Sequence, residues 1–406
     1  MPKPISPQAI FHLDSLALTL LLTLLISFGP LSVDLYVPSM PEIARVMHAP
    51  GSQVQLTVSL YLVGFGIGQI IYGPISDHFG RKPAIVAAFA IFCAASVFCF
   101  FSTSIEVLVV GRFLQGLGVS GSSVVTRAMV RDLYEGSRAS LQFSTMNMFM
   151  GAMPIFAPLM GGVLATYFGW HSVFVFQLAA GTATAAMVIF CLSESRPGGT
   201  ISPREILRGY RVIVTNGAFL ANMGIGALAY SGLFAWITGS AFVLQAVVGL
   251  SPLEYSFCYA TACSGFIVGG WFGTRLVVSH GFNVMAAIGA SFCAVAGVLI
   301  VTSAFIGFAL PITLTLSMAV YFIGLAILLA QSTAAALMPF PQQAGTASSL
   351  IGFVQQAAGA TMGTLVGATL GKTTAVPMAL FIAGAGVSAL VLWALTRRVR
   401  AASTAG

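Results

Sequence analysis

Two ionisable residues lie within long apolar stretches of the sequence: Asp34 near the end of the first stretch, and Arg112 within the fourth. A charged side chain at the centre of a bilayer costs roughly 2.5 to 3.5 kcal/mol, so such residues usually face a cavity and serve the movement of ions or substrates. A carboxyl group there, next to a cation, can take up and release a proton. We therefore expect Asp34 to carry a proton and Arg112 to tune it. The alternative for Asp34 is an ordinary carboxylate at a hydrated helix end.

The composition is that of an integral membrane protein. Of the 406 residues, 58% are hydrophobic and only 7% are charged, a balance not expected of a soluble domain of this length. Apolar runs of about 20 residues, each long enough to cross the hydrocarbon core as a helix, recur along the chain. The sequence predicts twelve such spans, centred near residues 25, 63, 92, 117, 153, 181, 224, 264, 294, 321, 357 and 385.

The net charge of +7 is explained by topology. With an even number of spans, all of the 17 lysines and arginines except Arg45, Arg112 and Lys372 fall on one side of the membrane. Cytoplasmic loops carry such an excess of positive charge, so both termini are predicted to be cytoplasmic. Anionic lipid headgroups are the expected partner of these basic residues, and nucleic acid is not.

Nothing in the sequence indicates an enzyme, a metal site or a cofactor. The six cysteines fall inside predicted spans, where we expect free thiols. The five histidines fall at span ends or in connectors, without the spacing of a zinc site. The N-terminal segment lacks the layout of a signal peptide, so we expect no segment to be removed.

The longest hydrophilic stretch, Ser193 to Arg211, lies between the sixth and seventh predicted spans. It predicts an N-terminal six-helix bundle over residues 1–192, a cytoplasmic linker over 193–212 and a C-terminal six-helix bundle over 213–406. Secondary transporters are commonly built from two such halves, with the substrate site between them near the bilayer midplane.

A glycine-rich, charged turn follows the second predicted span and contains Gly73, Asp77, Gly80 and Arg81. Gly80 permits a tight turn with positive φ, and Asp77 can accept hydrogen bonds from an arginine or a helix N-terminus. Composition alone also fits a short, positively charged connector. The full pattern resembles the G-x-x-x-D-x-x-G-R-K/R loop of the major facilitator superfamily.

That resemblance implies an all-α integral membrane protein with the major facilitator fold, twelve transmembrane helices in two six-helix halves. In that family the loop holds the two halves together on the cytoplasmic side. The resemblance therefore assigns Gly73, Asp77, Gly80 and Arg81 to a cytoplasmic gate. Arg131 and Asp132, at the end of the fourth span, resemble the rest of the same charge network.

The fourth span surrounds Arg112 with four glycines, which permit close approach of neighbouring helices. The segment that begins at Arg112 resembles the R-x-x-Q-G-x-G signature associated with proton coupling in drug:proton antiporters of the same superfamily. The alternative is a structural arginine whose guanidinium is bound by backbone carbonyl groups.

The fifth span resembles the antiporter signature G-x-x-x-G-P-x-x-G-G of the superfamily. It carries Gly151, Pro154, Pro158, Gly161 and Gly162, and departs from the signature at residue 157, which is alanine where glycine is expected. Because alanine is still small, we expect the helix bend to survive. A purely structural kink is the alternative, since proline and glycine are frequent in membrane helices.

Asp34, Tyr36 and Pro38 form a D-x-Y-x-P pattern at the end of the first span. Together with the three signatures, this pattern resembles the Bcr/CflA group of multidrug exporters of the bacterial inner membrane, most strongly over the first six spans. The resemblance implies a monomeric multi-pass transporter that exports amphipathic compounds in exchange for protons by alternating access.

A pocket rich in aromatic and apolar surface favours permissive binding of such compounds over strict recognition of sugars or phosphates. Polar or aromatic residues at mid-membrane depth are the candidates for substrate contact, although each could equally be satisfied within a helix interface. They are Tyr36, Tyr61, Asn147, Asn222, Tyr230, Phe234, Gln331, Gln355 and Gln356.

Two alternatives remain open. One keeps the fold and changes the task to export of a small metabolite, such as an amino acid or nucleoside, or to proton-coupled uptake. The other is a membrane-embedded enzyme or sensor, for which the sequence offers no nucleophile–base pair or metal-ligand cluster.

Overall fold

The computed structural model describes residues 15–134, 136–199, 203–307, 310–340, 343–369 and 374–402, and every regular element in these ranges is a helix. The long helices are α1 (Leu16–Asp34), α3 (Gly51–Phe79), α4 (Arg81–Phe100), α5 (Ile105–Leu133), α6 (Gly136–Phe168), α7 (His171–Cys191), α9 (Gly217–Ala241), α10 (Pro252–Ile306), α11 (Leu310–Leu337), α12 (Ala344–Thr369) and α13 (Val376–Leu395). The short ones are η1 (Val37–Ser39), α2 (Met40–Val46), α8 (Pro203–Val214), η2 (Phe242–Val247) and α14 (Arg397–Ala402).

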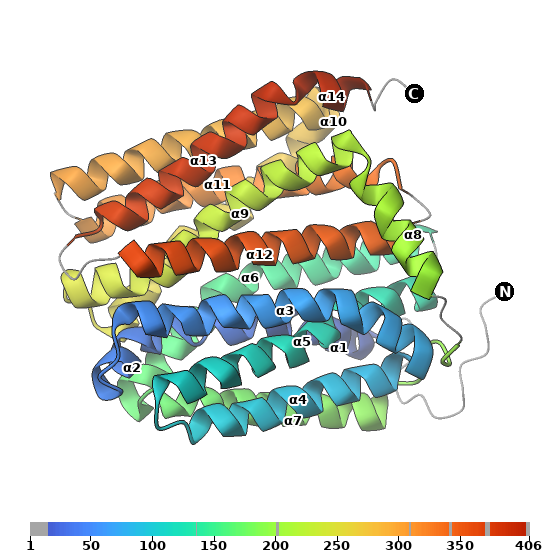
Figure 1. The fold of residues 1–406 in the computed structure, drawn as a ribbon, viewed down its shortest axis with the longest axis horizontal. Helices are drawn as coiled ribbons and strands as arrows, with labels where there is room; N and C mark the ends of the chain where they lie inside the picture. The colour runs from blue at the N-terminus through green and yellow to red at the C-terminus, as the bar shows by residue number, and fades with distance from the viewer. Residues whose placement is uncertain are drawn as a thin grey trace.

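The long helices account for all twelve predicted spans. Ten helices in the described part of the chain are long and apolar enough to cross a membrane. One of them, α10, holds two spans, because the backbone leaves the helical region at Gly281 with φ 76° and ψ 166°. The remaining span is α12, whose 26 residues run the length of the bundle beside α3 in Figure 1. The fold is therefore the predicted helical membrane architecture.

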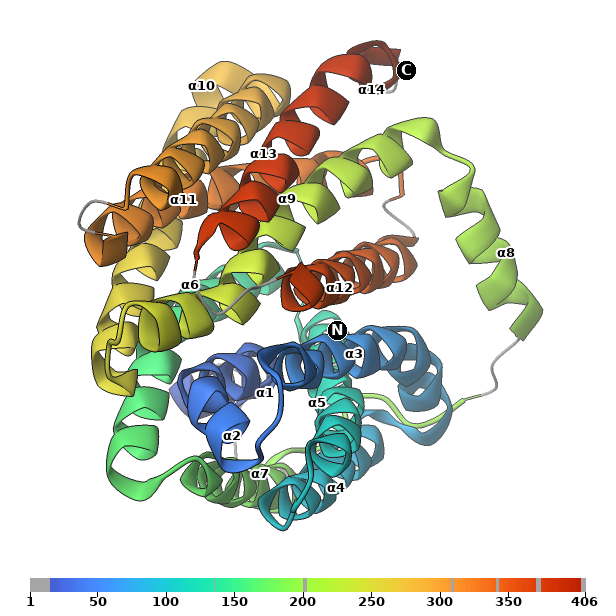
Figure 2. The same ribbon diagram turned by 60° about the vertical axis from the view of Figure 1, so that its left-hand side comes forward.

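The helices form two groups, α1 to α7 and α9 to α13, which meet along α3 and α12 and along α6 and α10 (Figure 1). Figure 2 shows α8 lying across one side between the groups. This helix falls largely within the stretch expected to be a linker and runs two residues beyond its predicted end at residue 212.

The bundle has two ends, each marked by a short helix. At the α2 end, α2 and η2 contact each other, and at the opposite, α8 end lies α8 (Figure 1). Because α1 runs from the α8 end to the α2 end, Asp34, its last residue, lies toward the α2 end.

Glycines make the contact between the two groups unusually close. On α12, Gly363 and Gly367 face Ser59 and Gln55 of α3 in the other group, while Gly359 faces Phe234 of α9 in its own group. A methyl group at any of the three would come within 3.0 Å of its neighbour. Small residues permit this approach of helix backbones in membranes. The three glycines thus form a ridge of close packing on this helix.

Candidate proton and transport site

Asp34 is buried where the two helix groups meet. Its side chain is 5% exposed, and its Oδ1 accepts a hydrogen bond of 3.0 Å from the hydroxyl of Tyr259 on α10. The carboxyl thus belongs to the first half of the chain and its partner to the second. Among the described side chains Asp34 is the one acidic residue that is buried, and its role as the proton carrier stays a prediction.

Two consecutive glycines of α6 bring the acid and its partner together. A Cβ atom at Gly161 would overlap with the backbone carbonyl of Leu35, the residue after Asp34. A Cβ atom at Gly162 would overlap with the hydroxyl of Ser256, which lies one turn before Tyr259 on α10. These two positions of the antiporter pattern therefore let α6 contact both helices at backbone distance.

The five residues of that pattern do not have the same surroundings. A Cβ atom at Gly151 would have nothing within 4 Å, in contrast with Gly161 and Gly162. Pro154 and Pro158 lie inside α6, which stays helical over its whole length despite both prolines. The packing role is thus concentrated at the Gly-Gly pair.

We predict that Gly161→Ala impairs transport because the added methyl group must displace the backbone of α1 next to Asp34. Overpacking of this kind costs about 1 to 3 kcal/mol. The matched control is Gly151→Ala in the same helix, where the structure leaves room for the methyl group. Efflux assays at equal membrane expression should show a several-fold loss for the first variant only, and equal activity of the two would contradict the packing account.

Arg112 is fully buried on α5 between two aromatic rings. Its guanidinium carbon lies 4.4 Å from the ring centroids of both Tyr36 and Tyr61. Nη1 donates to Gln115 Oε1 at 2.7 Å and to Ser32 Oγ at 3.5 Å, while Nε and Nη2 have no protein acceptor. Cation–π interactions and one short hydrogen bond therefore hold the charge, rather than the backbone carbonyl groups considered as the alternative.

Gln115 extends this contact into a buried network. Its Nε2 donates to Ser96 Oγ on α4 at 2.7 Å and to Gln177 Oε1 on α7 at 2.9 Å. Gln177 in turn donates to the carbonyl of Ser32 at 3.0 Å. Sequence reasoning overlooked Gln177, although an isolated amide in an apolar span was a usable signal.

Asp34 and Arg112 form no ion pair in the structure, although both residues are described. The ring of Tyr61 contacts the guanidinium, and the described side chain bonded to the carboxyl is Tyr259. The Tyr61 hydroxyl donates to the carbonyl of Gly29 at 2.9 Å, which fixes the ring against α1. The expected direct pairing of acid and cation is thus absent from the described side chains, and the tuning role of Arg112 stays a prediction.

The candidates for substrate contact separate into groups. Tyr36 and Tyr61 enclose Arg112 in the first half, and the Tyr36 hydroxyl also shares a 2.8 Å hydrogen bond with Thr57. In the second half, Asn222 and Gln355 line one small pocket with Gly226, Ser332 and Ile351.

The remaining candidates lie near the contact between the halves or apart from it. Tyr230 packs on Phe234 with ring centroids 5.1 Å apart and accepts a 3.4 Å hydrogen bond from Gln356. Gln331 is buried on α11. The side chain of Asn147 lies outside the described residues. Substrate contact stays a prediction for all of these residues.

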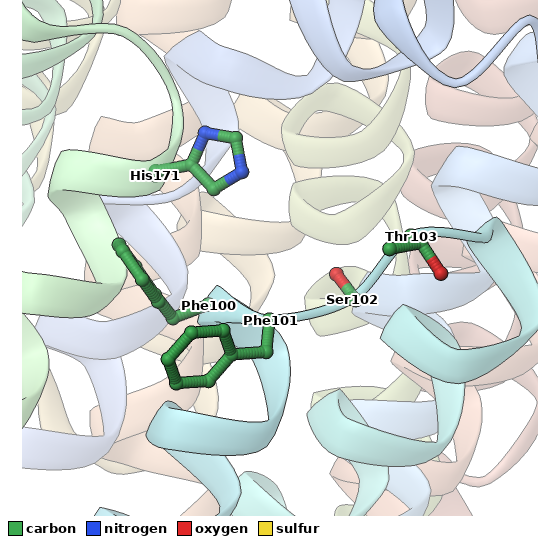
Figure 3. A pocket seen from close by; sticks show the side chains of 5 residues that line it. All are labelled: Phe100, Phe101, Ser102, Thr103 and His171. Carbon is green, nitrogen blue, oxygen red and sulfur yellow. The ribbon is translucent and has the colours of Figure 1, made fainter.

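A larger hollow, of about 480 Å³, lies away from the buried acid and cation. Figure 3 shows its lining, in which Phe100, Phe101, Ser102 and Thr103 come from the end of α4 and the turn that follows, and His171 from the start of α7. His171 also stacks on Trp170, with ring centroids 3.6 Å apart. Because the hollow lies among helices of the first half, it does not form the path between the halves.

At the α8 end, Arg81 is the centre of a charged cluster. It contacts Asp77 Oδ1 at 2.6 Å through Nη1 and Asp132 Oδ2 at 2.8 Å through Nε. Gly80 has φ 100°, a conformation that favours glycine and that ends α3 so that α4 can begin at Arg81. The loop pattern thus forms the compact ion-paired turn that its residues predicted.

Hydrogen bonds join the linker to the turn between α3 and α4. Both oxygens of Glu194 accept from the first backbone N–H groups of α4, from Arg81 at 2.9 Å and from Lys82 at 3.0 Å. The backbone N–H of Gly199 donates to the carbonyl of Asp77 at 2.9 Å. Glu194 lies in the stretch predicted to be a linker, and its place as a cap at a helix N-terminus is a further site feature that the sequence reasoning overlooked.

The ion pairs of the described cluster stay within the first half and the linker. Contact with the second half comes instead from Arg131, whose Nη1 lies 2.9 Å from where a Cβ atom of Gly345 on α12 would stand. Gly73 has open space around it. The role of the six predicted residues as a gate between the halves therefore remains a prediction, with Arg131 as the residue that reaches across.

We predict that Asp77→Asn slows turnover several-fold while leaving substrate affinity near normal, since Asp77 lies far along α3 from the buried site. Arg81 would keep its bond to Asp132, so the turn should still fold. Measured drug binding and efflux rates would separate the two effects. A collapse of affinity at an unchanged rate would place Asp77 in the binding site and refute the gate assignment.

Comparison with known proteins agrees with this geometry. The family model described as Major Facilitator Superfamily matches residues 20–364. Multidrug resistance protein D of Escherichia coli (strain K12) is 31% identical over 341 residues, which are 83% of this chain and 85% of that protein. The Bicyclomycin resistance protein homolog of Haemophilus influenzae is 30% identical over 386 residues, covering 93% of this chain and 96% of that one.

A solved structure shows the same fold at lower identity. The crystal structure of a D-xylose–proton symporter superposes with a TM-score of 0.74 at 16% identity, covering 93% of this chain and 98% of that one. The names of the two sequence relatives accord with the resemblance to the Bcr/CflA group.

Proposed function

Because the chain belongs to the major facilitator superfamily, we propose that it is a drug:proton antiporter that exports amphipathic organic compounds by alternating access. Relatives at about 30% identity over most of the chain are named for resistance to multiple drugs and to bicyclomycin. The observation that carries the proposal is Asp34, a buried carboxyl hydrogen-bonded across the two halves. Since alternating access moves the halves against each other, an acid at their junction is placed to respond to that movement.

In this proposal the α8 end faces the cytoplasm of a bacterium, and the transporter lies in the inner membrane as a monomer. The positive residues of the α3–α4 turn, α8 and α14 support that orientation. Headgroups of anionic lipids would contact them. A proton moving inward down a membrane potential of 100 mV releases roughly 2.3 kcal/mol, enough to sustain a substrate gradient of some tens-fold.

A susceptibility panel tests the proposed function. The chain is expressed in a bacterial host that lacks its own major efflux pumps, and growth is measured against amphipathic cationic, neutral and anionic drugs. We expect the tolerated concentration of several unrelated compounds to rise at least fourfold over the empty vector. No change for any drug, together with altered accumulation of an amino acid or nucleoside, would favour metabolite transport instead.

A further inference from the structure

The hydrogen bond between Tyr259 and Asp34 is a polar contact between the halves that depends on a titratable group. Tyr259 is 1% exposed on α10, in the second half, and its hydroxyl donates to the carboxyl at the end of α1 in the first half. A second tyrosine, Tyr255, lies one turn earlier on α10 and is also fully buried. Its hydroxyl shares a 3.0 Å hydrogen bond with Ser240, which belongs to the same half.

The surroundings of Asp34 contain titratable groups but no ion-paired cation. Tyr259 is bonded to it, and Tyr255 and Cys263, also on α10, are close enough to interact electrostatically with it. Tyr61 on α3 and Tyr230 on α9 are also close enough to interact electrostatically with it, and Arg112 on α5 packs on the Tyr61 ring. The Tyr259 hydroxyl is the one side-chain donor bonded to the carboxyl among the described residues.

Further contacts between the halves surround this bond at the α2 end. Gln55 on α3 donates to the carbonyl of Thr238 on α9 at 3.0 Å, and Gln245 on η2 donates to the carbonyl of Pro38 at 3.1 Å. Both donors are neutral amides bonded to backbone carbonyls. Proton uptake in the physiological range changes neither of them, so within this set only the bond to Asp34 responds to protonation.

We propose that Tyr259 is the positioning residue that links the protonation state of Asp34 to the closure of the α2 end. This inference rests on the proposed function of Asp34 and adds to it the group in the second half that responds to the proton. With Asp34 ionised, the hydroxyl–carboxylate bond holds α1 and α10 together. With Asp34 protonated, the bond becomes a weaker neutral one, and this end opens more readily.

The physical basis is the difference between a charge-assisted hydrogen bond and a neutral one. A hydroxyl bonded to a carboxylate forms a bond roughly twice as strong as a neutral pair. By linkage, whatever the bond adds to the closed state also favours the ionised form of the acid. Removing the hydroxyl should therefore alter both the closure of the α2 end and the pH at which transport operates.

Tyr259→Phe removes the hydroxyl and keeps the ring, and Tyr255→Phe is the matched control. Drug efflux is measured from pH 5.5 to 8.5 in proteoliposomes. A carboxyl that loses a donor gives up its proton less readily, so we expect the half-maximal pH of Tyr259→Phe to move upward by roughly half to one unit. We expect no shift for Tyr255→Phe, because its bond does not involve Asp34.

A labelling experiment reports closure directly. Ser59 is 1% exposed, faces Gly363 across the halves, and its hydroxyl has no protein hydrogen-bond partner, so Ser59→Cys is a mild probe. A polar maleimide is applied to the protein in nanodiscs, with the chain lacking the introduced cysteine as the blank. Because the thiolate is the form that reacts with a maleimide and its fraction falls with pH, each labelling rate is divided by that of free cysteine at the same pH. The corrected rate should rise several-fold from pH 8.5 to 5.5 in the Ser59→Cys protein, and should be high at both values when Tyr259→Phe is added.

Each outcome separates the inference from the proposed function. If Asp34→Asn abolishes efflux while Tyr259→Phe matches Tyr255→Phe in both pH profile and labelling, Tyr259 has no coupling role and the inference is overturned. If Asp34→Asn retains full pH-dependent efflux, the proton is carried elsewhere and the proposed role of Asp34, on which the inference rests, is wrong. If both tyrosine variants lose the pH response equally, general loosening of α10 explains the result and the specific role of Tyr259 is refuted.

Discussion

Replacing Asp34 with asparagine is expected to reduce drug resistance to the level of cells that carry the empty vector. The change conserves side-chain volume, and the amide oxygen can still accept from the Tyr259 hydroxyl, so the contact between α1 and α10 should survive. What is lost is the ability to take up and release a proton. Substrate binding should therefore persist within a few-fold while proton-driven export fails.

The control is Glu106→Gln, the same acid-to-amide change at an exposed position in the first turn of α5. Its resistance should equal that of the unmodified chain at equal membrane expression. Full resistance in cells that express Asp34→Asn normally would show that the proton is carried elsewhere.

Replacing Arg112 with alanine is expected to lower transport by about tenfold or more, the effect of roughly 1.4 kcal/mol on the limiting barrier. The change removes the cation that both tyrosine rings enclose and leaves Gln115 without its donor. Tyr61 should then keep its hydrogen bond to Gly29 and lose the guanidinium that packs on its ring. Efflux rate and its pH profile in proteoliposomes measure the effect.

Arg112→Lys should restore only part of the activity, because an ammonium group lacks the planar surface that stacks between two rings. Arg275→Ala is the matched control, since Arg275 lies 4.2 Å over the ring of Trp271 on an exposed face of α10. A normal rate with an unchanged pH profile in Arg112→Ala would show that the cation and the acid are not coupled.

The fold could be predicted because apolar length is a strong signal. All twelve predicted centres fall within long helices, including both spans of α10, which Gly281 separates only by a change of backbone angle. The helix α8 was not predicted within the linker. It has 12 residues, fewer than a membrane span needs, and its charged residues made the stretch read as a hydrophilic connector. Hydropathy detects what crosses a membrane and says little about helices outside it.

The site was predicted in part, for a definite physical reason. Asp34 and Arg112 stood out because a charge in an apolar span is rare and costly. Tyr259 did not, because an aromatic residue in a membrane helix is ordinary and its hydrogen bond joins positions 225 residues apart. The expected pairing of acid with cation also depended on side-chain directions, which spacing along the chain does not determine.

The Gly161–Gly162 pair illustrates the same limit. Its pattern predicted a bend in the helix, and only the structure shows that the pair packs against the residue after Asp34 and the turn before Tyr259. Similarly, the loop pattern predicted the ion pairs of Arg81, whereas the cap formed by Glu194 joins residues more than 100 positions apart.

The central claim is that a proton on Asp34 drives export, and proteoliposomes test it most directly. One preparation is given a pH gradient, and a second, without a gradient, measures exchange of labelled for unlabelled drug. We predict that the unmodified chain performs both reactions and that Asp34→Asn performs only the exchange. Drug movement driven by the pH gradient at the normal rate in Asp34→Asn would contradict the account.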